Sequence, residues 1–321
     1  MDLTLINIDY QNVVGLFSMA GYLRSRGYSV EIIDGSVWHI KKELSRRKNN
    51  LSLVGFSAVT GSIMAVAELC NFVKRDISPS IVCIIGGFHA SALPRETLLD
   101  FKFDIAVVGE GEMTIEEIVR AYRSGSSHPY MIKGTVEHYK DDIIFNEPRE
   151  LIPDLDVLGY PAYDMVDFDY YARGGLDVGY KDRYPMTLLL TRGCPFNCIF
   201  CCSRNIWRGK VRSYSSGYTL ELICFLIKRH GISFINFLDD DFFAKRSFFI
   251  PFVEGLMQKG FHRKLRWSCQ ATSKNSTLEN LIMAKKGGCI LVRYGFESFS
   301  QPMLDFIKSG YIKVEDHIQA I

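Results

Sequence analysis

Three cysteines lie close together in the middle of the sequence. Cys194, Cys198 and Cys201 follow the spacing C-x3-C-x2-C. They come directly after the apolar run 186–190, which predicts a buried strand, and Gly193 predicts a turn into a loop. Three thiolates on one loop can converge on a single metal centre. A structural zinc ion usually takes four protein ligands, whereas three cysteines match a [4Fe–4S] cluster with one iron left open.

Two plainer interpretations of these cysteines remain open, a zinc loop and simple packing. Cysteine is among the most buried residue types, so scattered cysteines carry little information. Five others in the chain fit that description: Cys70, Cys83, Cys224, Cys269 and Cys289. Cys202 stays outside the proposed ligand set, because its use would change the spacing to C-x3-C-x3-C.

The cysteine stretch resembles the cluster loop of the radical S-adenosylmethionine enzymes, whose signature is C-x3-C-x-aromatic-C. Phe200 stands at the aromatic position. The resemblance implies that Cys194, Cys198 and Cys201 hold a [4Fe–4S] cluster and that Phe200 lies near the adenine of S-adenosylmethionine. It also implies cleavage of S-adenosylmethionine to a 5′-deoxyadenosyl radical, with an electron from an external donor of the flavodoxin or ferredoxin type.

Length and composition are those of an ordinary globular protein. The 321 residues are 47% hydrophobic and 23% charged, with a net charge of +2, which is enough chain for two domains. No dense basic tract predicts nucleic-acid binding, and no apolar run approaches the ~20 residues that span a bilayer. The N-terminus lacks a signal-peptide pattern. Nine cysteines, an odd number, favour a reducing compartment, so we expect a cytoplasmic protein.

The first third of the chain alternates between strand and helix patterns. Apolar runs predict strands at 3–8, 28–33, 53–57, 81–85 and 105–108, with helices between them, and Thr114 is the expected cap of a further helix. Such alternation predicts a parallel sheet covered on both faces. We therefore expect a Rossmann-like domain over residues 1–125.

The strand ends of this domain are rich in glycine, and ligands of such sheets bind beyond the carboxyl ends of the strands. No G-x-G-x-x-G opens the first helix, which disfavours a dinucleotide. The segments 86–90 (GGFHA) and 109–112 (GEGE) resemble the cobalamin-binding domain that precedes the radical domain in one subgroup of the family. The resemblance implies cobalamin contacts from Gly15, Ser57, Thr60, Gly86, Gly87, His89, Gly109, Glu110 and Gly111.

Alternatives to cobalamin binding remain open here. His89 is equally compatible with a hydrogen bond to neighbouring backbone, and the domain can keep its fold without the cofactor. The motif that supplies a histidine to cobalt in other cobalamin proteins is absent, so we expect no histidine ligand on the lower face.

Residues 126–183 form the expected connector, with a hairpin from runs at 131–136 and 143–145. From 184 to 321 four strand–helix units follow, with strands predicted at 186–190, 234–238, 265–269 and 289–294. This pattern predicts a barrel-like parallel architecture with chemistry at the C-terminal strand ends. The family's (β/α)6 barrel has six units, so we expect a partial barrel that is a fragment or is completed by a partner.

Acidic residues follow two of these strands. Asp239 and Asp240 resemble the acidic pair after the family's second strand, and Glu297 resembles the Glu of its G-x-E-S turn. The resemblance implies contacts to S-adenosylmethionine, and helix capping is the alternative. Many relatives carry an arginine after the third strand, whereas Lys274 is the nearest cation here.

These observations together predict a cobalamin-dependent radical S-adenosylmethionine enzyme that transfers a methyl group to an unactivated carbon or phosphorus of a small molecule. Cyclisation or oxidation without methyl transfer is one alternative, and a non-catalytic cobalamin-binding protein is another. A methylthiotransferase is disfavoured, because only Cys70 and Cys83 precede the connector and a second cluster needs three cysteines. No catalytic side chain is assigned.

Overall fold

The computed structural model describes residues 1–8, 13–125, 131–139, 142–168 and 185–321. The chain divides into two compact units. The first comprises Met1–Ile152 with Leu158–Val166, and the second comprises Pro153–Val157 with Asp167–Ile321. No helix among the described residues is both long and apolar enough to cross a membrane.

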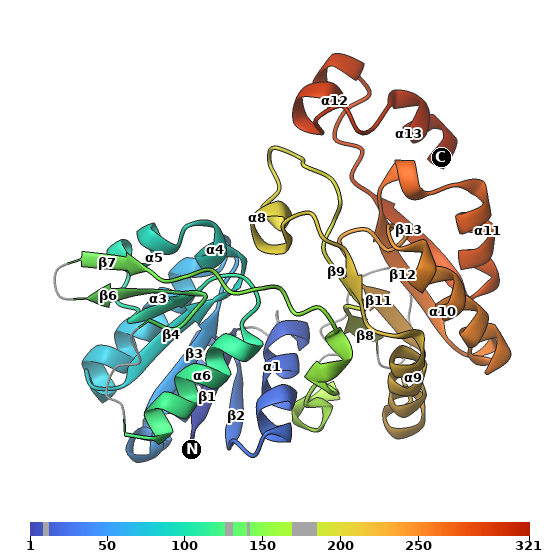
Figure 1. Ribbon diagram of the computed structural model, residues 1–321. Helices are drawn as coiled ribbons and strands as arrows, with labels where there is room; N and C mark the ends of the chain where they lie inside the picture. The colour runs from blue at the N-terminus through green and yellow to red at the C-terminus, as the bar shows by residue number, and fades with distance from the viewer. Residues whose placement is uncertain (9–12, 126–130, 140–141, 169–184) are drawn as a thin grey trace. The chain divides into compact units, whose positions relative to one another are not determined.

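A seven-stranded sheet forms the centre of the first unit (Figure 1). Its strands are β1 Leu3–Ile8, β2 Val30–Gly35, β3 Leu53–Ser57, β4 Val82–Gly86, β5 Ile105–Val107, β6 Thr135–Tyr139 and β7 Asp142–Phe145. The order is β2-β1-β3-β4-β5-β6-β7. The first five strands are parallel, and the predicted hairpin extends the same sheet as two antiparallel strands.

Helices connect the parallel strands of the first unit. They are α1 Val13–Ser25, α2 Val37–Arg46, α3 Ile63–Phe72, α4 Gly87–Ala92, α5 Pro94–Asp100 and α6 Glu112–Arg123. Every residue of β1 is buried, as expected for a central strand covered on both faces. The prediction of Thr114 as a helix cap is wrong. Helix α6 begins at Glu112, and the Thr114 hydroxyl, inside the helix, donates to the Lys133 carbonyl at 3.2 Å.

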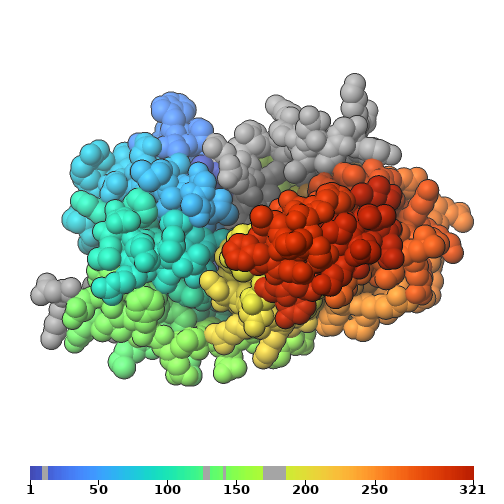
Figure 2. Space-filling view, turned by 90° about the horizontal axis from the view of Figure 1, so that it is seen from above, coloured from blue at the N-terminus to red at the C-terminus, as the bar shows by residue number. Residues whose placement is uncertain are grey.

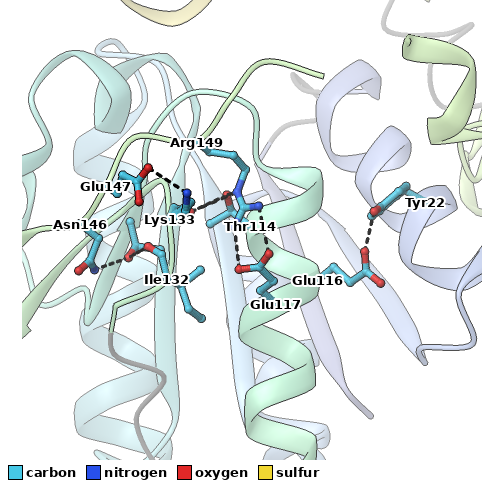
Figure 3. A network of polar contacts seen from close by, with 10 residues as sticks. Tyr22, Thr114, Glu116, Glu117, Ile132, Lys133, Asn146, Glu147 and Arg149 are labelled. Atoms are coloured by element: carbon cyan, nitrogen blue, oxygen red, sulfur yellow. Dashed lines mark hydrogen bonds and ion pairs between the residues drawn. The ribbon is translucent and has the colours of Figure 1, made fainter. Parts of the chain in front are cut away.

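Polar contacts fix α6 from two sides (Figure 3). Arg149 lies in the segment after β7, and it donates to the Thr114 hydroxyl at 2.7 Å and pairs with Glu117 at 2.8 Å. On the other side, the Tyr22 hydroxyl of α1 donates to Glu116 at 2.6 Å. Burial, followed by the hydrogen bond to Glu116, raises the pKa of Tyr22 to about 12. These bonds anchor the helix that follows the glycine-rich end of β5.

The second unit contains a four-stranded parallel sheet in the order β13-β12-β11-β8 (Figure 1). The strands are β8 Pro185–Leu188, β11 Phe234–Phe237, β12 Arg266–Ala271 and β13 Cys289–Tyr294. Its helices are α8 Ser203–Trp207, α9 Ser216–His230, α10 Arg246–Gln258, α11 Leu278–Lys286, α12 Gln301–Ile307 and α13 Val314–Ala320. A Rossmann-like sheet and four β/α units of a barrel confirm the predicted fold class.

An aromatic core packs on one face of this sheet. Phe237 of β11 and Trp267 of β12 both contact Phe252 of α10, with ring centroids 5.8 and 6.4 Å apart. All three side chains are fully buried. Burying a side chain of this size contributes about 1.5–3 kcal/mol, so the aromatic cluster fixes α10 on the sheet and holds the strand ends in place.

Candidate functional site

The cysteine loop starts from a short antiparallel ribbon that sequence analysis did not predict. Strand β9, Thr191–Arg192, pairs with β10, Arg212–Ser213. Gly193 follows with φ +107°, and a Cβ atom there would lie 2.1 Å from the Lys210 carbonyl oxygen. Only glycine fits such a close approach of two backbone segments. The ribbon therefore fixes where the loop leaves the sheet.

The segment after α12 holds the middle of the cysteine loop. Ile199 donates its backbone N–H to the Ile307 carbonyl at 2.9 Å, and the Ser309 hydroxyl donates to the Asn197 carbonyl at 2.6 Å. We call residues 307–309 the clamp segment. In Figure 2 the yellow residues near 200 border the red C-terminal residues, in agreement with these bonds. A loop held at its base and at its middle can present its side chains in a fixed arrangement.

The three thiols of the loop influence one another electrostatically. Burial, with smaller contributions from neighbouring Asp241, Asp240 and Cys198, raises the pKa of Cys194 to about 12, although the Phe196 backbone N–H opposes the rise. Burial also raises the pKa of Cys198, with smaller increases from Cys201 and Glu297, whereas Lys308 lowers it. Thiols with raised pKa values keep their protons until a metal displaces them.

One contact beside the three cysteines is of a kind that occurs at iron–sulfur clusters. The three sulfur atoms come from one loop, and the backbone N–H of Ser203 lies 3.4 Å from the Cys201 sulfur, the kind of N–H to sulfur contact found at such clusters. In the part of the chain that the structure describes, no three or more His, Cys, Asp or Glu side chains are grouped closely enough to hold a metal ion as they stand. The ligand role of Cys194, Cys198 and Cys201 stays a prediction.

Three consecutive carboxylates after β11 bond to different parts of this unit. Asp239 is fully buried, and its Oδ1 accepts from the backbone N–H groups of Leu190 and Thr191 and from the Thr191 hydroxyl. Asp240 accepts from the Ser203 hydroxyl at 2.9 Å. Asp241 accepts from Thr272 and Asn275. The triplet thus joins the strand before the cysteine loop, the helix after it and the end of β12.

Burial dominates the electrostatics of Asp239. It raises the pKa of this carboxyl to about 7, against the opposing effect of the Thr191 and Leu190 hydrogen bonds. Among the described residues its Oδ2 atom has no hydrogen-bond partner. Burial also raises the pKa of Asp240, although the Ser203 hydrogen bond lowers it in part. Of the predicted pair, Asp239 is a buried anchor and Asp240 lies nearer the cysteine loop.

Glu297 follows β13 in a strained conformation. Its φ of +63° is uncommon for a residue with a side chain. Its side chain is 40% exposed, and Lys308 of the clamp segment lies 3.9 Å away. Lys308 is itself buried and donates to the Gly295 carbonyl at 2.5 Å. Lys308 was not predicted as a site residue, because a lysine at a helix end resembles an ordinary solvated residue in the sequence. Lys274 donates to the Tyr311 carbonyl, and Phe200 is exposed.

In the first unit, the structure brings the ends of β3 and β4 together. The Thr60 Oγ1 atom and the His89 Nδ1 atom contact each other at 3.1 Å. The backbone N–H of His89 donates to the Ala58 carbonyl. Gly87 has φ +91°, and a Cβ atom there would lie 2.8 Å from the Ala58 oxygen. The predicted residues Ser57 and Gly86 belong to the same two strand ends. The strand ends are therefore packed backbone to backbone.

The remaining predicted cobalamin residues divide between two positions. Gly15 lies exposed in α1. The backbone N–H of Gly109 donates to the Ser91 hydroxyl at 3.0 Å. Gly111 directly precedes the first residue of α6. Glu110 is buried and accepts from the Ile152 N–H at 2.8 Å. The Glu110 carboxylate therefore anchors the chain after the hairpin.

Comparison with known protein families gives a match in the first unit. The B12 binding domain family matches residues 10–119. Among curated proteins, an uncharacterized methyltransferase of Pyrococcus horikoshii is 31% identical over 96% of this chain and 65% of its own length. The anaerobic magnesium-protoporphyrin IX monomethyl ester cyclase of Cereibacter sphaeroides is 27% identical over 89% of this chain and 47% of its own. The chain thus spans about half to two-thirds of these relatives.

Solved structures share the fold of the whole chain. The radical S-adenosylmethionine methyltransferase TsrM of Kitasatospora setae aligns with a TM-score of 0.80 at 17% identity, over 100% of this chain and 65% of its own. The cobalamin-dependent S-adenosylmethionine radical enzyme OxsB aligns with a TM-score of 0.81 at 18% identity, over 98% of this chain and 46% of its own. The chain thus shares its fold with solved radical S-adenosylmethionine enzymes, and its first unit matches the B12 binding domain family.

Proposed function

We propose that this chain belongs to an enzyme that uses cobalamin and S-adenosylmethionine to transfer a methyl group to an unactivated carbon or phosphorus of a small molecule. The observation that carries the proposal is the cysteine loop itself. It sits at the C-terminal ends of parallel strands, fixed by Gly193 at its base and by the clamp segment at its middle. That position is where barrels of this kind carry their chemistry.

The roles of the chain's own residues follow from their positions. Cys194, Cys198 and Cys201 would hold the [4Fe–4S] cluster in the fixed loop. Glu297, half-exposed beside the loop, suits a polar contact to S-adenosylmethionine. Asp240, bonded to Ser203 next to the last cysteine, suits a second contact. Asp239 would position the start of the loop by accepting the backbone N–H groups of Leu190 and Thr191.

When bound, the cofactors would supply chemistry that no side chain offers, namely reductive cleavage of S-adenosylmethionine and carriage of a methyl group. The reducing electron would come from an external flavodoxin- or ferredoxin-type donor. In the first unit, the glycine-rich ends of β3, β4 and β5 let a large flat ligand approach the backbone. His89, buried against Thr60, would not serve as a cobalt ligand.

Ring formation is the second candidate function. Three of the curated relatives are anaerobic magnesium-protoporphyrin IX monomethyl ester cyclases at 24–27% identity. The methyltransferase proposal is preferred because the 31% identical relative is named a methyltransferase. The two candidate functions can be distinguished with S-adenosylmethionine that carries a labelled methyl group, since only methyl transfer places the label in the product.

Anaerobic reconstitution with iron and sulfide, in the presence of cobalamin, tests the proposal. We expect about four irons per chain and an equimolar amount of cobalamin, with 5′-deoxyadenosine formed when S-adenosylmethionine and a reductant are added. Cys198→Ala should lose the iron and keep the cobalamin. The matched control is Cys224→Ala, which removes a cysteine of α9 outside the loop and should keep both.

Each failure has a distinct meaning. Iron without cobalamin would remove the methyl-transfer proposal and leave radical chemistry. Iron that survives Cys198→Ala would refute the ligand assignment. Cobalamin without iron would indicate a binding protein that performs no S-adenosylmethionine cleavage.

A further inference from the structure

The second sheet has an unusually polar inner face. Phe237 and Trp267 point to the helix-covered face, so the residues that alternate with them, Asn236 and Ser268, point to the opposite face. The strand register pairs Asn236 with Thr187 and Ser268, and places Gln270 beside Arg293. Barrel interiors are usually filled by branched aliphatic side chains. Polar side chains at these positions of the four strands depart from that rule, and such departures mark functional positions.

Arg293 lies beside Gln270, one alternating position further along the sheet than Asn236 and Ser268. Its guanidinium donates to the Oδ1 atom of Asn236, and the Ser268 hydroxyl donates to the same oxygen at 2.8 Å. Asn236 and Ser268 are 2% and 0% exposed. The buried Asn236 amide is oriented by the buried Ser268 hydroxyl, and it therefore fixes the position of the Arg293 guanidinium. Arg293 itself is partly exposed, so its remaining N–H groups are open to a ligand.

Arg293 has no acidic partner in the described part of the chain, where no ion pair includes it. The nearby carboxylates of the unit are engaged elsewhere: Asp239 with Thr191, and Asp241 with Thr272 and Asn275. A guanidinium carries five donors in a rigid fork that matches carboxylate and phosphate oxygens. A partly buried cation without a counter-ion gains most when an anionic ligand supplies one.

We propose that Arg293 forms a subsite for an anionic group, a carboxylate or a phosphate, on the small-molecule substrate. The proposal rests on the proposed function, because it assigns the substrate class of the same site. Arg293 lies four positions before Glu297, near the C-terminal end of β13. Arg293 thus lies within β13, just before the strand end that Glu297 follows. In this position it binds one end of a substrate whose other end faces the cysteine loop.

The test uses the full chain without cofactors and inorganic phosphate as the probe. Arginine side-chain N–H resonances are followed by NMR during a phosphate titration at constant ionic strength, with chloride as the reference anion. Wild-type protein should show one saturable arginine response. Arg293→Gln should weaken phosphate binding by at least about tenfold, since a charged hydrogen bond contributes about 1.5–3 kcal/mol.

Two further variants make the test specific. Arg246→Gln removes an arginine of α10 that pairs with Glu279, and it should leave phosphate binding unchanged. Asn236→Asp places a carboxylate against Arg293, so it should abolish phosphate binding while the arginine remains. Wild-type protein that binds no phosphate, or Arg293→Gln that binds as well as wild type, would overturn the proposal.

A second arm separates the substrate from S-adenosylmethionine, which also carries a carboxylate. The affinity of the reconstituted protein for S-adenosylmethionine should change by less than about twofold in Arg293→Gln, because the proposed contact is not made. A loss as large as that for phosphate would assign Arg293 to S-adenosylmethionine and refute the substrate subsite. Since the phosphate arm needs no cluster, failure of the proposed function would not alter its result.

Discussion

The two sheets of this chain use their faces differently. In the first unit, every residue of β1 is buried and the strand ends are built from glycine and backbone contacts. In the second unit, one face of the sheet is an aromatic core and the other carries Asn236, Ser268 and Arg293. A sheet buried on both faces offers a ligand only its edge. A sheet with one polar face also offers the surface of its strands.

The difference between the two sheets indicates which unit is expected to determine substrate specificity. Contacts through backbone and glycine suit a large common cofactor, because they recognise shape more than side-chain chemistry. Side chains that project from a strand face can differ from one relative to the next without disturbing the fold. The second unit is therefore the place to look for substrate recognition.

The largest effect is expected where two backbones approach most closely. Gly193→Ala places a Cβ atom 2.1 Å from the Lys210 carbonyl at φ +107°, and we expect the second unit to lose about 3 kcal/mol of stability. Gly87→Ala meets the Ala58 oxygen at 2.8 Å and should cost the first unit about 2 kcal/mol. Hydrogen exchange, measured separately in each unit, checks both values.

A matched glycine gives the control for this pair. Gly61→Ala has open space around the new Cβ atom and no positive φ, so it should change stability by less than about 0.5 kcal/mol. If Gly193→Ala exchanged as slowly as wild type, the loop base would not be constrained as described.

The pH dependence of stability should differ between the units. The pKa of Asp239 is about 7 in the folded chain, above the usual 3.8. Below pH 3.8 the carboxyl is protonated in both the folded and unfolded states, so its favourable contribution is fully present there. As the pH rises from 3.8 to 7, only the unfolded state releases this proton, so the second unit loses a few kcal/mol of stability and the loss is complete above pH 7.

Asp239→Asn isolates this contribution. The variant should gain stability relative to wild type between pH 5 and pH 8, as measured by hydrogen exchange in the second unit. In the first unit the large shift to about 12 belongs to Tyr22, whose contribution is lost only above pH 10. Equal differences between variant and wild type at pH 5 and pH 8 would contradict the assignment.

The smallest effect is expected at the clamp segment. Lys308→Met removes the donor to the Gly295 carbonyl and the cation beside Glu297. We expect a loss of about 1–2 kcal/mol and faster release of iron to a chelator from reconstituted protein. Lys313→Met, which removes an exposed cation paired with Asp305, serves as the control. Identical release from the two variants would show that the clamp does not act through Lys308.

Most of the strands were predictable from local pattern. Apolar runs bounded by glycine or polar residues located β1, β3 and β13 to the residue, because the strands of parallel sheets are short and largely apolar. The hairpin was also predicted, but its union with the first sheet was not. Pairing of β6 with β5 depends on contacts between distant segments, which no local pattern encodes.

The site was predictable only in part. The cysteine spacing located the loop, but the β9–β10 ribbon has two residues in each strand, too few for a periodic signal. The prediction for Thr114 failed because its hydroxyl donates to the Lys133 carbonyl and accepts from Arg149, both of which lie outside the helix. Lys308 and Arg293 gave no signal, since their importance comes from partners such as Asn236 that lie far away in the sequence.

The clamp segment has a consequence for synthesis on the ribosome. Ser309 lies 112 positions after Asn197, to which it bonds. At about 5–20 residues per second, the cysteine loop leaves the ribosome roughly 6–20 s before its clamp exists. During that interval the thiols are exposed to the solvent on an incompletely held loop. Loading of the proposed cluster is therefore best suited to the period after residue 309 has emerged from the ribosome.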